Sequence, residues 1–156
     1  MNLQDVLDVL AALEREGVRY AVFGGLAMAA HGLDRGTRDL DLFLAADEEN
    51  VARLRRALHG VYEDPAIEEI TSADLDGEYP AIQYGPPGVT FTIDIVSRLG
   101  DAFTFADLDV QHVRVGELEV AVVTPRTLYA MKRNTVRPRD ADDAARLRRA
   151  FDLEDD

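Results

Sequence analysis

The 156-residue chain contains no cysteine, which excludes a disulfide framework and any metal site built on thiolates. A membrane-spanning helix needs about 20 apolar residues, and the longest apolar run, residues 20–30, is shorter and contains Gly24 and Gly25. The first residues lack the basic region and apolar core of a signal peptide. We therefore expect a cytoplasmic protein that does not enter a membrane.

Positive charge is also scarce, with 17 basic against 30 acidic residues, a formal net charge of −13 and Lys132 as the only lysine. Such a field repels polyanions at long range, which argues against a general nucleic-acid-binding module. The negative net charge remains compatible with an enzyme that holds one phosphorylated end through a metal and a local basic patch. The length predicts one domain over residues 1–156, with a core to about residue 123 and C-terminal helices over about residues 124–151.

Hydrophobic spacing and turn residues predict an α/β (α+β) fold, a mixed sheet of roughly four to six strands with helices packed mainly on one face. Helices are expected at the N-terminus up to Gly17, at residues 26–30, from Asp47 to Gly60 and from Thr124 to about Arg133. After a break at residues 137–140, a last helix is expected, with Ala144, Leu147 and Phe151 on its inner side. Strands are expected at residues 18–23, 39–44, 79–84, 89–96, 111–115 and 118–123. Residues 61–78 and 101–109 are expected to be loops, the latter with one helical turn.

One stretch carries the chemistry of the chain. In the strand at residues 39–44, Asp39 and Asp41 alternate with leucines, so both carboxylates project to the same face, about 6.5–7 Å apart at Cα. Two like charges at this spacing call for a cation between them, and Mg²⁺ is typically held by carboxylates together with substrate phosphates. Gly24 and Gly25 stand before a short helix, where backbone N–H groups can receive an anion. Together these features predict a nucleoside triphosphate site.

The order of these residues resembles the signature of nucleotidyltransferases of the DNA polymerase β superfamily. The fuller string resembles the small bacterial members related to abortive-infection toxins; its positions here are Gly24, Gly25, Ala27, His31, Gly32, Arg35, Thr37, Asp39 and Asp41. The resemblance covers residues 18–44, is thinner at Asp94, and returns over residues 132–143. It implies a nucleotidyltransferase fold, Mg²⁺ (or Mn²⁺) as cofactor and NTP as substrate.

Asp94 is an acid in the middle of an otherwise apolar strand, where an unpaired buried carboxylate is costly. One interpretation pairs it with an arginine or places it on a wet face. The superfamily pattern instead implies a third metal carboxylate on a strand beside the first two, and Asp94 is the best match. The resemblance then assigns metal binding to Asp39, Asp41 and Asp94, and activation of the attacking hydroxyl to Asp94.

A second basic constellation lies between Arg126 and Arg139, which contains five basic residues and no acid. Residues 132–143 resemble the C-terminal motif of the same toxin-like enzymes, which implies that Lys132 binds triphosphate and that Arg137 or Arg139 positions phosphate or orients the last helix. Asp140 and Asp143 would hold these arginines. The alternative is a helix junction made of Arg–Asp pairs, which we favour for Asp140 and Asp143.

Three residues near the first motif have competing interpretations. Arg35 and Arg38 either compensate Asp34, Asp39 and Asp41 or contact nucleotide phosphate. His31 lacks a matching serine or cysteine nucleophile, so we expect a structural role at the end of the short helix.

The sequence thus predicts transfer of NMP from an NTP to a hydroxyl of an RNA end, a protein or a small molecule. The family implies a toxin and a cognate antitoxin. The alternatives are an enzyme that modifies an antibiotic and a non-catalytic member that binds nucleotide or a partner.

Overall fold

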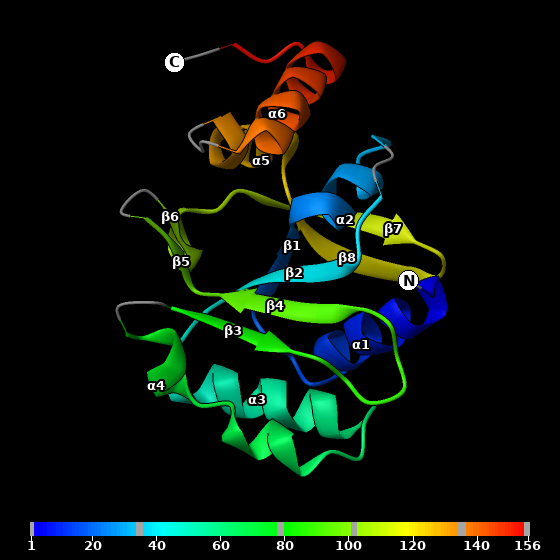
Figure 1. Cartoon of the computed structure of the whole chain (residues 1–156), viewed down its shortest axis with the longest axis vertical. Coiled ribbons are helices and arrows are strands. Elements are labelled where there is room, and N and C mark those ends of the chain that lie inside the picture. The colour runs from blue at the N-terminus through cyan, green and yellow to red at the C-terminus, as the bar shows by residue number, and fades with distance from the viewer. Residues whose placement is uncertain (1, 34–35, 78–79, 101–102, 134–136, 155–156) are drawn as a thin grey trace.

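The computed structural model describes residues 2–33, 36–77, 80–100, 103–133 and 137–154 (Figure 1). Its helices are α1 (Leu3–Arg15), α2 (Gly24–Ala30), α3 (Glu48–His59), α4 (Ser72–Leu75), α5 (Pro125–Arg133) and α6 (Pro138–Phe151), with 3-10 turns at Pro65–Glu69 and Phe105–Asp107. Its strands are β1 (Tyr20–Phe23), β2 (Asp39–Leu44), β3 (Ala81–Tyr84), β4 (Thr92–Val96), β5 (Arg98–Leu99), β6 (Phe103–Thr104), β7 (Val110–Val115) and β8 (Leu118–Val123).

The described strands form one six-stranded mixed sheet in the order β3-β4-β2-β1-β8-β7, and β5 and β6 form a separate ribbon. β1 runs antiparallel to β2 and parallel to β8, while β2 and β4 run parallel. The two predicted hairpins, β3–β4 and β7–β8, are both present. The α/β class and the mixed sheet expected from the sequence are therefore confirmed.

The helix ends follow the capping residues in the sequence. Asn2 caps α1 by accepting a 2.9 Å hydrogen bond from the Gln4 backbone N–H. Asp47 caps α3 by accepting from the Asn50 backbone N–H. Asn50 is itself buried and bonds through its side chain to Arg19 and Ala45, which ties the start of α3 to the ends of β1 and β2. Capping thus fixes where these helices meet the sheet.

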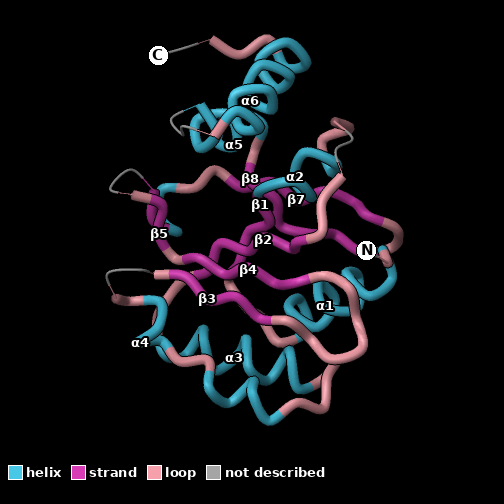
Figure 2. Tube along the Cα trace, in the orientation of Figure 1, coloured by secondary structure: helices cyan, strands magenta, loops and turns pink. Residues whose placement is uncertain are grey.

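Alternation along the central strands separates a core face from a polar face. Leu40 and Leu42 on β2 and Ile93 and Ile95 on β4 are fully buried, whereas the residues between them, such as Asp41, are half-buried. In the orientation of Figure 1, α1 and α3 lie below the sheet, and α5 and α6 lie above it. The tube view in Figure 2 shows the pair α5–α6 joined to β8 by one short connection.

Several sequence predictions need correction. Residues 65–75, expected to be a loop, contain a 3-10 turn and α4, because Ile67, Ile70 and Leu75 are buried against the core. The expected loop at residues 101–109 contains the predicted helical turn, at Phe105–Asp107, but also β6, which pairs with β5. The two strands of this ribbon have two residues each and are too short to show a pattern.

The expected chain break at residues 137–140 is also wrong, because α6 already begins at Pro138. Phe151, predicted to face inward, is 37% exposed. The predicted strand start at Tyr79 lies outside the described residues. Within the described residues, no helix is long and apolar enough to cross a membrane.

Candidate active site

The parallel pairing of β2 and β4 brings the three predicted carboxylates together. Asp41 is directly aligned with Asp94, and Asp39 is aligned with Thr92. Neighbouring strands lie about 4.7–4.9 Å apart, so aligned side chains on one face are close neighbours. The Thr92 hydroxyl donates a 2.6 Å hydrogen bond to Asp39 Oδ1. The register therefore gathers Asp39, Asp41 and Asp94 on one open face of the sheet.

The environment of Asp94 disfavours its negative charge. Burial raises the pKa of the Asp94 carboxyl, and the negative charge of Asp39 raises it further, while a hydrogen bond with Gln83 partly offsets both. Gln83 is the residue opposite Asp94 on β3. In the part of the chain that the structure describes, neither Asp39 nor Asp94 forms a salt bridge. The alternative interpretation, in which an arginine pairs with Asp94, is thus not observed among the described residues.

This donor set suits a hard divalent cation. Carboxylate oxygens are the ligands that Mg²⁺ prefers, and a bound cation would offset the burial and the charge of Asp39 that disfavour ionised Asp94. No three His, Cys, Asp or Glu side chains among the described residues already converge as metal ligands. The residues fit a cation in chemistry and charge, and binding would require the carboxylates to turn toward it.

Gly24 is required by the position of Asp41. Its φ is +69°, and a Cβ atom added there would lie 2.1 Å from Asp41 Oδ2. Both the backbone conformation and the carboxylate therefore exclude a side chain. Phe23, which precedes α2, provides no side-chain cap to its first N–H groups. The sequence predicted a close approach to a ligand at this glycine, and the structure places the Asp41 carboxylate there.

Two adjoining hollows meet at the carboxylates. The larger, of about 680 Å³, is lined by the three carboxylates together with Gly36, Thr37, Arg38, Arg137 and Arg139. The smaller, of about 170 Å³, is lined by Gly24, Gly25, Asp41, Lys132, Arg137, Asp140 and apolar residues of α5 and β5. Asp41 and Arg137 line both, so the two hollows form one cleft between the sheet and the α5–α6 pair.

Lys132 is held inside a buried ion-pair cluster. Its Nζ lies 2.9 Å from Asp143 Oδ2 and 3.3 Å from Asp140 Oδ1, and all three residues are at most 6% exposed. Asp140 also pairs with Arg137 through distances of 2.9 and 3.3 Å. The predicted Arg–Asp junction is therefore present at Asp140, whereas Asp143 pairs with Lys132. Lys132 reaches the cleft with its charge already shared between two carboxylates.

The arginines of the cleft differ in their contacts. The hydrogen bond and charge of Asp140 raise the pKa of Arg137, and the charge of Asp41 adds to this effect. Arg139 donates a 3.2 Å hydrogen bond to the Gly36 carbonyl. Arg38 is exposed and forms no ion pair with Asp39, Asp41 or any other described residue. The interpretation of Arg38 as a charge compensator thus lacks a contact, whereas Arg35 and Asp34 lie outside the described residues.

Sequence reasoning missed two polar residues that shape this site. Thr92 bonds Asp39, and Gln83 bonds Asp94. Alternation along β4 places Thr92 on the Asp94 face, and this signal could have identified it.

His31 has the structural role expected of it. Its Nε2 donates a 2.7 Å hydrogen bond to the Val123 carbonyl at the end of β8. Its ring also meets that of Phe151 edge-on at 5.9 Å. His31 therefore links α2 to the start of the α5–α6 pair.

Comparison with known proteins gives a family match. Residues 7–155 match the profile of the nucleotidyl transferase AbiEii toxin of the type IV toxin–antitoxin systems. No curated protein sequence matches the chain significantly.

Two solved structures resemble the fold. TM1012 of Thermotoga maritima, which is proposed to be a nucleotidyltransferase, aligns with a TM-score of 0.55 and 17% identity over 96% of this chain and 92% of its own. The antibiotic-resistance factor ANT(2'')-Ia aligns with a TM-score of 0.50 and 16% identity over 96% of this chain and 90% of its own. At these identities the likeness establishes the fold alone.

Proposed function

The chain belongs to the AbiEii family of nucleotidyltransferase toxins from type IV toxin–antitoxin systems, and on this basis we propose a metal-dependent transfer of NMP from an NTP to an acceptor hydroxyl. The observation that carries the proposal is the alignment of Asp41 with Asp94 on parallel strands, beside Asp39 and the Gly24 turn. Asp39 and Asp94 form no salt bridge with a described residue and lie beside Asp41, which supports a role of the three carboxylates in binding metal and nucleotide.

In the proposed reaction, the acceptor oxygen attacks the α-phosphorus, the bond from the α-phosphorus to the bridging oxygen of the β-phosphate breaks, and pyrophosphate leaves. Divalent cations held by Asp39, Asp41 and Asp94 would stabilise the developing charge and acidify the acceptor hydroxyl. Asp94 takes the hydroxyl proton.

The phosphates beyond the reacting one need donors that the carboxylates cannot provide. We assign these to the backbone of Gly24 and Gly25 and to the side chains of Arg38, Lys132 and Arg137, all of which line the cleft. Arg38 and the 74%-exposed Arg137 can offer paired N–H donors to a phosphate. Lys132 would contribute its charge through the smaller hollow while it remains bonded to Asp143.

Among the acceptors, charge distribution favours an RNA end. Residues 1–124 contain 23 acidic and 9 basic residues, whereas α5 and α6 expose arginines and, among their described acids, only Asp142. The exposed arginines are Arg126, Arg133, Arg137, Arg139, Arg148 and Arg149. A hollow of about 360 Å³ between the two helices is lined by three of them, Arg133, Arg148 and Arg149. Phosphates of a polyanion could lie along this surface while its terminal hydroxyl enters the cleft.

The deciding experiment supplies the protein with each α-labelled NTP, Mg²⁺ and cell extract, and identifies the labelled species. We expect metal-dependent labelling of RNA, and growth arrest when the protein is expressed without an antitoxin. Label on a protein or on an added antibiotic would replace the RNA acceptor without affecting the transfer reaction. No labelled species with any NTP would instead indicate a non-catalytic binder.

Asp41→Asn tests the metal site directly. Because this substitution removes a ligand charge at nearly constant shape, Mg²⁺-dependent NTP binding should become undetectable by calorimetry, while the circular dichroism spectrum stays unchanged. An unaltered magnesium affinity in this variant would show that Asp41 is not a metal ligand. Asp76→Asn, at an exposed carboxylate after α4, is the matched control and should bind normally.

A further inference from the structure

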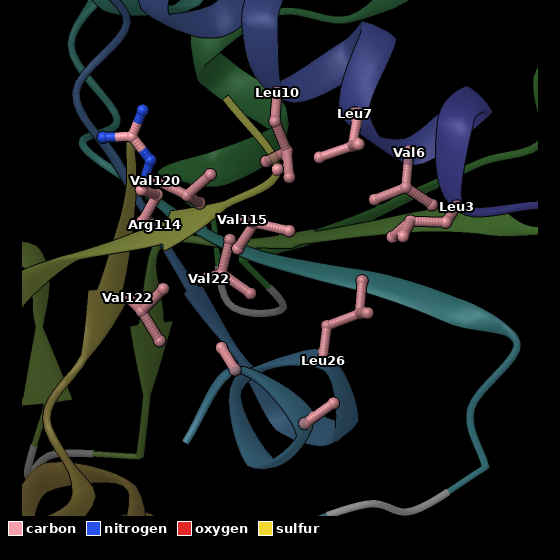
Figure 3. Close-up of a pocket in the computed structure, with 13 residues that line it drawn as sticks. Leu3, Val6, Leu7, Leu10, Val22, Leu26, Arg114, Val115, Val120 and Val122 are labelled. Carbon is pink, nitrogen blue, oxygen red and sulfur yellow. The ribbon is translucent and has the colours of Figure 1, made fainter. Parts of the chain in front are cut away.

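A second hollow, of about 370 Å³, lies away from the carboxylate cleft, between α1, α2 and the β7–β8 hairpin. Figure 3 shows Leu3, Val6 and Leu10 directed from α1 toward the sheet, and Leu26 directed toward them from α2. Apart from Arg114 and Gly116, the residues that line the hollow have aliphatic side chains. Protein interiors leave few voids larger than a water molecule, so an aliphatic hollow of this size is a candidate binding site.

The only charged residue of the lining is Arg114. It is exposed, and within the described residues it forms no hydrogen bond or ion pair through its side chain. Glu119 is its cross-strand neighbour on β8 but does not approach to salt-bridge distance. Figure 3 shows the Arg114 guanidinium to one side of the aliphatic cluster. A cation at the edge of an apolar hollow is complementary to a ligand with one anionic group and an apolar body.

We propose that this hollow binds a small amphipathic anion, of the class of medium-chain carboxylates, with its apolar body against α1 and α2 and its carboxylate on Arg114. The volume falls within the range of about 300–1,000 Å³ typical of ligand pockets. Leu3, 57% exposed on the hollow's rim, would be covered by the ligand. A neutral or cationic amphiphile would leave Arg114 without a partner and is disfavoured.

Occupancy of this site would also stiffen α2. Leu26, Ala29 and Ala30 line the hollow on one side of that helix, while Gly24 and Gly25 at its first turn line the cleft. A ligand between α1 and α2 thus contacts the element that carries the glycine turn. The binding site itself depends only on the hollow and Arg114, and it stands whether or not the transfer reaction is confirmed.

The test is calorimetric titration of the full chain with decanoate and with decyltrimethylammonium, both below their micelle concentrations. We expect one decanoate per chain and much weaker binding of the cation. Arg114→Gln should weaken decanoate binding roughly tenfold, as expected for loss of a hydrogen bond to a charged group. Glu119→Gln should strengthen it. Arg56→Gln, at an exposed arginine on α3, makes the same charge change elsewhere and should have no effect.

A variant that fills the hollow, together with hydrogen exchange as a second measurement, distinguishes loss of binding from misfolding. Ala30→Phe places a ring in the hollow and should abolish decanoate binding with an unchanged circular dichroism spectrum. In the wild type, decanoate should slow hydrogen exchange of the α2 amides. Equal binding of the two amphiphiles, undiminished binding by Arg114→Gln, or unchanged exchange in α2 would overturn the proposal.

Discussion

The carboxylates of the sheet and those of α6 line the same cleft, yet they differ in the positive charge around them. Asp140 and Asp143 are almost fully buried, and each has a cation within 3 Å: Arg137 beside Asp140 and Lys132 beside Asp143. Asp39 and Asp94 are half-buried and have no such partner among the described residues. Burial of a charge is costly unless it is paired. Asp140 and Asp143 therefore belong to a buried ion-pair cluster, and Asp39 and Asp94 lack the counter-charge that a bound metal would provide.

This difference leads to opposite expectations for the same chemical change. Replacing a carboxylate of the sheet by its amide removes repulsion that the fold tolerates, so activity should fall and stability should not. Replacing a carboxylate of α6 leaves a buried cation without its partner, so stability should fall first. The following variants test this contrast, from the largest expected effect to the smallest.

Asp94→Asn should have the largest effect. The substitution keeps the shape of the side chain and removes the proton acceptor, so kcat should fall by roughly 10²–10⁴-fold, as is typical of a positioned acid–base group. Nucleotide binding should largely survive because Asp39 and Asp41 remain. Single-turnover transfer of label from an NTP, with binding measured separately, provides the readout. Transfer at the wild-type rate would return Asp94 to a structural role.

Asp143→Asn should instead destabilise the protein. Breaking a buried ion pair by removing one partner costs about 3–5 kcal/mol, and Asp143 is the nearer of the two carboxylates that bond Lys132. Urea unfolding followed by circular dichroism measures the loss. Asp142→Asn changes an exposed neighbour on the same helix and should alter the free energy of unfolding by less than about 0.5 kcal/mol. Equal effects of the two substitutions would remove the distinction between the two carboxylate groups.

Lys132→Ala tests whether Lys132 both binds phosphate in the cleft and stabilises the ion-pair cluster with Asp140 and Asp143. A phosphate contact beyond the α-phosphate predicts that triphosphate binding weakens by about 1.5–3 kcal/mol, the range for a hydrogen bond to a charged group, while monophosphate binding changes little. Its buried contacts with Asp140 and Asp143 also predict a loss of stability. Calorimetry with both nucleotides, at a temperature where the variant is folded, separates the two effects. Equal losses for the two nucleotides would confine Lys132 to the structural cluster.

The sequence alone was sufficient to predict where the carboxylates of the sheet lie. The alternation of acid and leucine in β2 determines which face the carboxylates occupy, and Thr124 with Pro125 correctly marks the start of α5. Asp94 stood out because it interrupts an apolar strand, and its alignment with Asp41 agrees with the superfamily pattern. Local periodicity and turn chemistry are enough where strands pair in simple register.

The contacts of the α6 carboxylates were harder to predict from the sequence. The contacts of Lys132 with Asp140 and Asp143 span 8 and 11 residues across the helix junction, and no helical spacing predicts such a distance. The ribbon β5–β6 and the turns of residues 65–75 are too short for periodicity to appear. The hollow beside Arg114 depends on how α1, α2 and the β7–β8 hairpin meet, which is a property of packing alone.

The smallest expected effect is a pH dependence of stability that belongs to Asp94. Because its pKa is raised in the folded state, the folded protein holds this proton to a higher pH than the unfolded chain does. Between the ordinary carboxyl pKa of about 3.9 and the raised value, the free energy of unfolding therefore falls as pH rises. Asp94→Asn lacks this contribution, so without divalent metal the variant should become more stable relative to the wild type across that window and keep the advantage at neutral pH.

Urea unfolding of both proteins at a series of pH values in EDTA measures the difference, and Asp142→Asn corrects for the loss of one negative charge. Added Mg²⁺ should reverse the order at neutral pH, since the cation stabilises ionised Asp94. A difference that does not change with pH, or a wild type that gains on the variant in EDTA, would contradict the account of Asp94 as a carboxylate without a compensating charge.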